Sequence, residues 1–153
     1  MGLEHSSIFI IKPEGYDRRE SIRRFIRRHS QLEIVDAKSA MLDQTDVENI
    51  FTDDFNTPLA RAIASHVVGR TVEIGLVSVE PDSELDVTRE LLGVCGEHFD
   101  PALCAQNTVR FQYGLNECAD YGGVKYHLNA IHKASANERE GATRWCIERF
   151  FTI

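Results

Sequence analysis

The residues best suited to chemistry lie at opposite ends of the chain. His132 closes residues 129–132 (sequence NAIH), and Lys12 lies in residues 11–15 (sequence IKPEG) near the start. A neutral imidazole is a competent nucleophile, and a lysine just past an apolar strand can hold an anion beside it. Because most of the chain separates the two segments, they can form one site only in the folded protein.

The composition is that of an acidic globular protein. The chain has 153 residues, of which 42% are hydrophobic and 27% are charged, so we expect one domain over residues 1–153. A chain of this size buries about 70% of the surface that its unfolded form exposes. The formal net charge of -7 argues against a general nucleic-acid binder, but it allows a small phosphorylated ligand in a local cationic pocket.

Neither a membrane span nor a metal or disulfide framework is predicted. The longest apolar run, residues 8–11, is far too short to cross a bilayer. The four cysteines (Cys95, Cys104, Cys118 and Cys146) include no Cys-x-x-Cys pair and fit neither a zinc site nor an obvious disulfide pattern. We therefore expect free thiols and a cytoplasmic protein.

Hydrophobic periodicity predicts the elements that must position the chemical residues. Strands are expected where β-branched and aromatic residues run together, and helices where apolar residues recur every three to four positions. The predicted strands cover residues 7–11, 32–37, 71–79 and 124–131. The predicted helices are residues 17–29 with Asp17 as N-cap, a short helix capped by Thr45, one opened by Thr57 and Pro58, one that begins near 81–83 and ends at Gly93, and 138–151.

The remaining segment, residues 94–123, has little periodicity, so we expect a long loop, and loops this long in a compact domain are usually functional. The order of the elements predicts an α+β fold: a ferredoxin-like split βαβ sandwich with a four-stranded antiparallel sheet and added helices. Fold alone does not give function.

Four short motifs give the sequence a specific resemblance. Residues 9–15 (FIIKPEG) end a strand with a KPEG turn, residues 89–93 read RELLG, residues 108–110 read TVR, and residues 129–132 read NAIH. In this order they resemble the motifs of the nucleoside diphosphate kinase family, and they span nearly the whole chain. We therefore identify the chain as a divergent relative of that family.

The resemblance implies a role for each matching residue. His132 would take the γ-phosphoryl group from a nucleoside triphosphate and pass it to a diphosphate, in a ping-pong cycle through phosphohistidine. Lys12, Arg89 and Arg110 would cancel charge on the phosphate oxygens, which is most of what phosphoryl transfer needs from a protein. The resemblance also carries the family's sugar contact onto Asn129. It implies Mg²⁺ carried on the nucleotide phosphates, with no metal ligands from the protein, and a homo-oligomer.

The base site implied by the resemblance falls on Phe51 and Leu59, with Ile63 four residues further on. Phe51 keeps a ring but lacks the hydroxyl of the family's tyrosine. Leu59 and Ile63 would hold a base by apolar contact, which does not distinguish a purine from a pyrimidine. The alternative is that these residues belong to a plain amphipathic helix that packs into the core.

Several departures from the family pattern affect the supporting residues. A phosphate-binding threonine falls on Cys95, a poorer hydrogen-bond donor. The serine beside the histidine is lost, although Ser135 is one step away, and the glutamate that orients the histidine falls on Trp145. Alternative orienting carboxylates are Glu138, Glu140 and Glu148. We expect insertions near residues 95–100 and 111–126 to enlarge loops beside the site, and turnover to be reduced.

One feature lies outside the resemblance. Six arginines crowd the predicted first helix: Arg18, Arg19, Arg23, Arg24, Arg27 and Arg28. Either carboxylates of this chain or of another subunit neutralise them, or they face an anionic partner such as RNA or phospholipid.

Sequence alone therefore predicts a nucleoside diphosphate kinase that binds nucleoside di- and triphosphates. The alternative within the same fold is a catalytically weakened nucleotide-binding module with a regulatory or scaffold role. A third hypothesis, a nucleic-acid binder that uses the arginine-rich helix, lacks a strand of aromatic residues on which bases could stack.

Overall fold

Strand β1 (Ser6–Ile11) forms the centre of the molecule, because its residues from Ser7 onward are buried on both faces. In the computed structural model, which describes residues 3–151, β1 pairs with β3 (Thr71–Ser78) on one side and with β6 (Ile131–Lys133) on the other. Strand β2 (Glu33–Met41) pairs with the outer side of β3. The order β2-β3-β1-β6 is antiparallel throughout, which confirms the predicted ferredoxin-like sheet.

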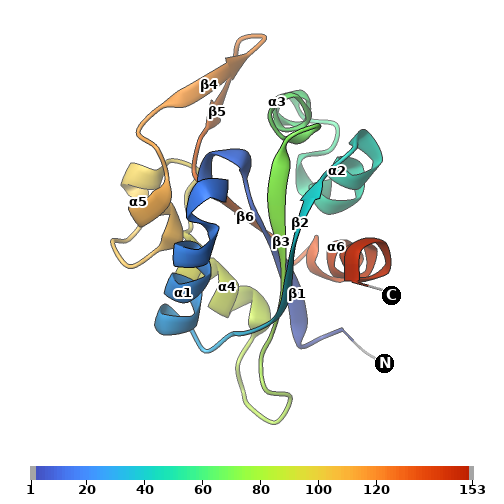
Figure 1. Cartoon of the computed structure of the whole chain (residues 1–153), viewed down its shortest axis with the longest axis vertical. Coiled ribbons are helices and arrows are strands. Elements are labelled where there is room, and N and C mark those ends of the chain that lie inside the picture. The colour runs from blue at the N-terminus through green and yellow to red at the C-terminus, as the bar shows by residue number, and fades with distance from the viewer. Residues whose placement is uncertain (1–2, 152–153) are drawn as a thin grey trace.

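Helices cover both faces of this sheet, which Figure 1 shows nearly edge-on. On one side lie α1 (Arg19–His29) and α4 (Val87–Cys95), with the short α5 (Val109–Tyr113) beside α1. On the other side lie α2 (Gln44–Ile50), α3 (Pro58–Val67) and α6 (Arg139–Cys146).

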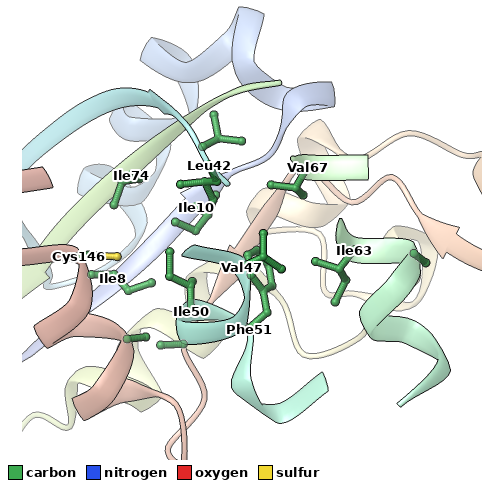
Figure 2. Close-up of a cluster of buried hydrophobic side chains, with 14 of the residues drawn as sticks. Ile8, Ile10, Leu42, Val47, Ile50, Phe51, Ile63, Val67, Ile74 and Cys146 are labelled. Atoms are coloured by element: carbon green, nitrogen blue, oxygen red, sulfur yellow. The ribbon is translucent and has the colours of Figure 1, made fainter. Parts of the chain in front are cut away.

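Alternation along β1 divides the core into two clusters. Ile8 and Ile10 point toward α2, α3 and α6, where they pack with Ile50, Ile63 and other apolar residues (Figure 2). Phe9 and Ile11 point the opposite way, into the cluster formed with α1 and α4. The strand that ends just before Lys12 is thus packed on both faces, and this fixes the position of the lysine backbone.

The prediction of a long loop over residues 94–123 is wrong. This segment holds the end of α4, a 3-10 turn (Pro101–Leu103), α5 and strand β4 (Cys118–Tyr121). Helix α5 begins where the Thr108 hydroxyl accepts a hydrogen bond from the amide of Phe111. The helix has five residues and is too short to leave a periodic pattern in the sequence.

The predicted strand over residues 124–131 is in fact two strands in two sheets. Strand β5 (Val124–His127) pairs with β4 in a separate hairpin, and only β6 joins the main sheet. Gly122 and Gly123 make the hairpin turn with positive φ angles of 63° and 88°, which glycine adopts without strain. Ala130, with a φ of 75°, separates β5 from β6.

Other boundaries also differ. Helix α2 is capped by Asp43, which exchanges hydrogen bonds with Asp46, and not by Thr45. Helix α4 begins after Asp86 and continues through Gly93 to Cys95. A 3-10 helix over Pro13–Arg18 precedes α1, so Asp17 does not cap it. A π-helical turn (Ile147–Phe151) follows α6 within the predicted last helix.

The start of α3 agrees with the prediction, with Thr57 at the N-cap and Pro58 in the first turn. All four cysteines are free, and Cys118 is the exposed one. Within residues 3–151, no helix combines the length and the hydrophobicity that a bilayer crossing requires.

Candidate functional site

The two distant motifs meet at the end of β1. The amide of Lys12 donates to the carbonyl of Ala130 (2.8 Å), and Glu14 Oε2 accepts from the amide of Ala130 (3.0 Å). Gly15 makes this approach possible, because a Cβ there would lie 3.0 Å from the Ala130 oxygen. The backbone therefore holds the KPEG and NAIH segments together, 114 or more residues apart in sequence.

His132 lies on β6 opposite Ile10, and its ring packs against that of Phe51 with the ring centres 4.2 Å apart and the planes tilted by 37°. Its Nε2 is 3.3 Å from Glu138 Oε1, and the two groups are not aligned as a hydrogen bond. Burial lowers the pKa of His132 below 6.5, and the neighbouring Glu138 only partly opposes this shift. The imidazole is therefore neutral at pH 7.

Of the three carboxylates that the sequence left open, Glu138 is the one beside His132. Glu138 accepts from the amides of Ser135 (3.2 Å) and Asp53 (2.9 Å), so its position is fixed by backbone. Burial acts to raise the pKa of Glu138, but His132 and these amides outweigh it and the pKa is lowered. The Ser135 hydroxyl contacts Asp53 (2.5 Å) and thereby supports Glu138.

The other two carboxylates, Glu140 and Glu148, are exposed on the last helix. Trp145, which takes the place of the family's orienting glutamate in sequence, donates its indole N–H to Asp46 (3.0 Å) and joins α6 to α2. It has no part in the surroundings of His132 that the structure describes.

A cavity of about 80 Å³ lies in front of His132. It brings together five of the predicted site residues apart from the histidine: Lys12, Phe51, Leu59, Arg110 and Asn129. Ile63 also lines it, and the other lining residues are Asp54, Phe99, Lys125, Tyr126 and His127.

Lys12 reaches this cavity as a buried cation, with 3% of its surface exposed. Its Nζ donates to the Tyr126 hydroxyl (2.8 Å) and lies 3.5 Å from Glu14 Oε2. Burial lowers the pKa of Lys12 to about 8, although Glu14 opposes the shift.

Arg110 is the second buried cation of the cavity. It donates to the carbonyl of Ile131 from Nε (3.2 Å) and Nη2 (3.0 Å), and to the carbonyl of His98 from Nη1 (3.0 Å). Carbonyl groups orient a guanidinium without cancelling its charge, and within residues 3–151 Arg110 forms no ion pair.

Asn129 is buried beside these cations with one polar atom unused. Its Nδ2 donates to the carbonyl of Phe99 (2.9 Å), whereas Oδ1 has no hydrogen-bond partner in the described part of the chain. An unsatisfied buried acceptor is costly, and here it belongs to a residue that lines a cavity.

Two predicted phosphate ligands are placed elsewhere. Arg89 is exposed on α4 and does not line the cavity. Cys95 is fully buried in the core cluster beneath α1 and α4, where burial raises the pKa of its thiol to about 12.

The cavity also contains residues that sequence reasoning did not select. Asp54 is one, and burial, then Glu138 and Asp53, raises its pKa to about 6. Phe99 comes from the first predicted insertion, and Tyr126 from the second. For Phe99 and Tyr126 the only signal was the position of these insertions beside the motifs, and Asp54 had no such signal.

No group of three or more histidine, cysteine or carboxylate side chains in the described ranges is placed to hold a metal ion. Among the residues that line the cavity, Asp54 is the single carboxylate.

Comparison with solved structures gives the fold a name. The chain is similar to the nucleoside diphosphate kinase of Aquifex aeolicus (TM-score 0.68, 16% identity, 97% of this chain and 95% of that one). It is also similar to the enzyme of Halobacterium salinarum in complex with CDP (TM-score 0.69, 20% identity, 98% and 89%). A third similar structure is a transition-state mimic of the Borrelia burgdorferi enzyme with vanadate and ADP (TM-score 0.67, 18% identity, 96% and 86%).

No protein-family model and no curated protein matches the sequence. The likeness in structure therefore shows the fold: this chain has the fold of the nucleoside diphosphate kinases.

Proposed function

We propose that this chain, which has the nucleoside diphosphate kinase fold, transfers a phosphoryl group between nucleotides through a phosphohistidine at His132. The observation that carries the proposal is the setting of the imidazole. It is neutral, packed against the ring of Phe51, faced by Glu138, and open to a cavity that Lys12 and Arg110 also line. A similar structure was solved with vanadate and ADP, which supports phosphoryl transfer as the chemistry of this fold.

The nucleophile of the reaction would be Nδ1 of His132. With Nε2 beside Glu138, the proton of the neutral ring belongs on Nε2, which leaves the Nδ1 lone pair free. That lone pair would bond to the γ-phosphorus as the bond to the β,γ-bridging oxygen breaks, and the nucleoside diphosphate leaves. An acceptor diphosphate would then attack the phosphohistidine through a terminal oxygen and restore the free imidazole.

Lys12 and Arg110 would stabilise the charge on the transferred group. Arg110 is already oriented by protein carbonyls, so it needs little reorganisation during the reaction. Asn129 Oδ1, the buried acceptor without a partner, would accept a hydrogen bond from a hydroxyl of the sugar. Leu59, Ile63 and Phe99 would provide apolar contacts for the base.

Mg²⁺ would enter on the nucleotide phosphates and supply charge neutralisation there. The lining of the cavity offers one carboxylate, Asp54, to an ion held in this way. Asp54 would accept hydrogen bonds from water on such an ion.

The test is to incubate the purified protein with Mg²⁺ and ATP labelled at the γ-phosphate. We expect an acid-labile, base-stable label on the wild type and none on His132→Ala. A matched control is His5→Ala, which removes a histidine outside the site. Absence of label from the wild type, or equal label on His132→Ala, would contradict the proposal.

A second candidate is a nucleotide-binding module that does not turn over. It is favoured by the exposed position of Arg89 and by the small volume of the cavity. Binding of ADP without any acid-labile label would identify the protein as such a module.

The proposal includes self-association. Strand β2 forms an open edge of the sheet in the single chain and carries two exposed apolar side chains, Val35 (53% exposed) and Met41 (62%). Unpaired edges of this kind favour pairing with another strand. Sedimentation of the wild type and of Val35→Lys should therefore differ in apparent mass.

We also propose a cytoplasmic location. The free state of all four cysteines supports a reducing compartment. A fluorescent fusion expressed in the native cell would test this location.

A further inference from the structure

The cavity at His132 is too small for the ligand that the proposed function requires. Its volume is about 80 Å³, whereas pockets that hold small organic ligands measure about 300–1,000 Å³. A phosphate group is closer to the available size than a nucleotide. For the cavity to enclose more than a phosphate group, some part of its wall has to move.

The β4–β5 hairpin is a part of the wall that lies outside the main sheet. Figure 1 shows it projecting beyond the end of the main sheet, next to α3. It forms a sheet of its own, and it contributes Lys125, Tyr126 and His127 to the cavity lining. An isolated two-stranded hairpin is marginally stable at best, so its position depends on its contacts with the rest of the chain.

One of these contacts engages the cavity directly. Tyr126 is buried, and its hydroxyl accepts the hydrogen bond from Lys12 Nζ at 2.8 Å. The phenol thereby occupies a donor position that a phosphate oxygen would need. A nucleotide phosphate can take this position on Lys12 only if the hydrogen bond between Lys12 and Tyr126 breaks.

A second contact holds the hairpin from outside the cavity. The Tyr121 hydroxyl lies 2.8 Å from His66 Nδ1 on α3, and His66 Nε2 donates to Glu14 Oε1 at 2.8 Å. Glu14 in turn accepts from the amide of Ala130, beside the site. His66 is buried and Tyr121 does not line the cavity, so this chain of bonds fixes the hairpin without touching a ligand.

We propose that the β4–β5 hairpin is a lid that closes the nucleotide site, held shut by Tyr126 on Lys12 and by Tyr121 on His66. The inference rests on the proposed function, since it concerns the entry of nucleotide into that site. Only the fraction of molecules with the lid open binds, so closure weakens the apparent affinity by that fraction.

The decisive variant is Tyr121→Phe, because it loosens the lid at a distance from the ligand. Loss of one hydrogen bond from the closed state should strengthen the apparent affinity for Mg²⁺-ADP about two- to tenfold. It should also speed hydrogen exchange of the amides in residues 118–127. Tyr126→Phe, which removes the hydrogen bond between the hairpin phenol and Lys12, should act in the same direction.

Tyr113→Phe is the matched control. Tyr113 is also half-buried, and within residues 3–151 its hydroxyl forms no hydrogen bond. The same change of one oxygen atom there should alter neither ADP affinity nor exchange in the hairpin.

Three outcomes would overturn the lid. Weaker ADP binding by Tyr121→Phe would make the hairpin a wall of the binding site. Unchanged affinity with faster exchange would show that hairpin opening does not control entry. No ADP binding by the wild type and both lid variants would leave no site to close. Failure of the proposed function is seen separately: ADP binding that responds to Tyr121→Phe, with no acid-labile label on His132, contradicts the kinase and retains the lid.

Discussion

The molecule has two concentrations of positive charge, and they differ in burial. The cavity holds Lys12 and Arg110, each about 3% exposed and each held by groups of the protein. Helix α1 and the residue before it carry six arginines, and Arg24, Arg27 and Arg28 among them are exposed. Charge density in the sequence points to the second region, whereas only the short motifs around Lys12 and Arg110 point to the first.

The arginines of α1 are only partly neutralised within the described chain. Arg23 pairs with the buried carboxylate of Glu73. Arg18 and Arg19 lie over the rings of Tyr113 and Tyr16, respectively. Arg24, Arg27 and Arg28 form no ion pair within residues 3–151, so water solvates their charge.

The difference between the two regions is that burial, and not the density of charge, changes the environment of a cation. A solvated arginine interacts weakly with its surroundings, and salt screens it. The buried Lys12 has lost its hydration, so its pKa falls to about 8. An anion bound beside it would stabilise the charged form in place of the lost water. The same burial keeps His132 neutral.

Among substitutions in the two regions, we expect the largest effect on phosphohistidine formation from a change of Glu138. Glu138→Gln should slow phosphohistidine formation by about 100-fold, since neutralising a carboxylate that orients a histidine can cost up to ~10⁴ in rate. Glu138 raises the pKa of His132, so the acid limb of the rate profile should move to lower pH. Single-turnover labelling from pH 4 to 8 measures both. Glu140→Gln, an exposed carboxylate of the same helix, is the control, and an equal loss there would refute the orienting role.

Loss of a buried cation should come next. Lys12→Met should weaken ADP binding by about 10- to 100-fold, as expected for a hydrogen bond to a charged group. The same change at an exposed cation, Arg24→Met, should alter the affinity by less than about twofold. Calorimetric titration of both variants compares the two regions directly, and equal losses would break the distinction between them.

The pH dependence of binding should follow Lys12. The charged form of Lys12 would attract phosphate, so the affinity for ADP should fall as pH rises through about 8. Above that pH the charged fraction of Lys12 falls about tenfold per pH unit, which corresponds to about 1.4 kcal/mol, and the affinity should approach the same slope. The stability of the free protein should change in the opposite direction. Between about 8 and 10.5 the unfolded chain still binds the proton that the native lysine has released, so unfolding becomes harder. Both trends should be absent from Lys12→Met, and a profile identical to the wild type would assign them to another group.

The smallest effect is expected on α1. Arg24→Glu combined with Arg28→Glu should change the labelling of His132 by less than about twofold and stability by about 0.5 kcal/mol per site or less. Arg61→Glu with Arg144→Glu gives the same change in net charge at other exposed positions. Retention of RNA by both double variants across a salt series tests whether this helix binds an anionic partner. A large loss of His132 labelling in the α1 variant would instead show that α1 belongs to the site.

The sequence predicted the central fold well because its signals are local. The apolar run before Lys12, the proline at the start of α3 and the alternation in β3 each depend on neighbouring residues, and the sheet followed from their order. The segment over residues 94–131 was mispredicted because its elements are short. A five-residue helix and two four-residue strands are stabilised by tertiary contacts rather than by periodicity.

By itself, the sequence determined the two motifs that meet at the site, the neutral-histidine chemistry they allow and the core that carries them. The tertiary structure decided which carboxylate faces His132, because the backbone amides of Asp53 and Ser135 fix Glu138 in space. It also decided that Arg89 lies outside the cavity and that a hairpin tyrosine holds Lys12. Two of the deciding contacts, Asp53 with Glu138 across 85 residues and Lys12 with Tyr126 across 114, join segments far apart in the chain, and no local pattern of residues encodes such contacts.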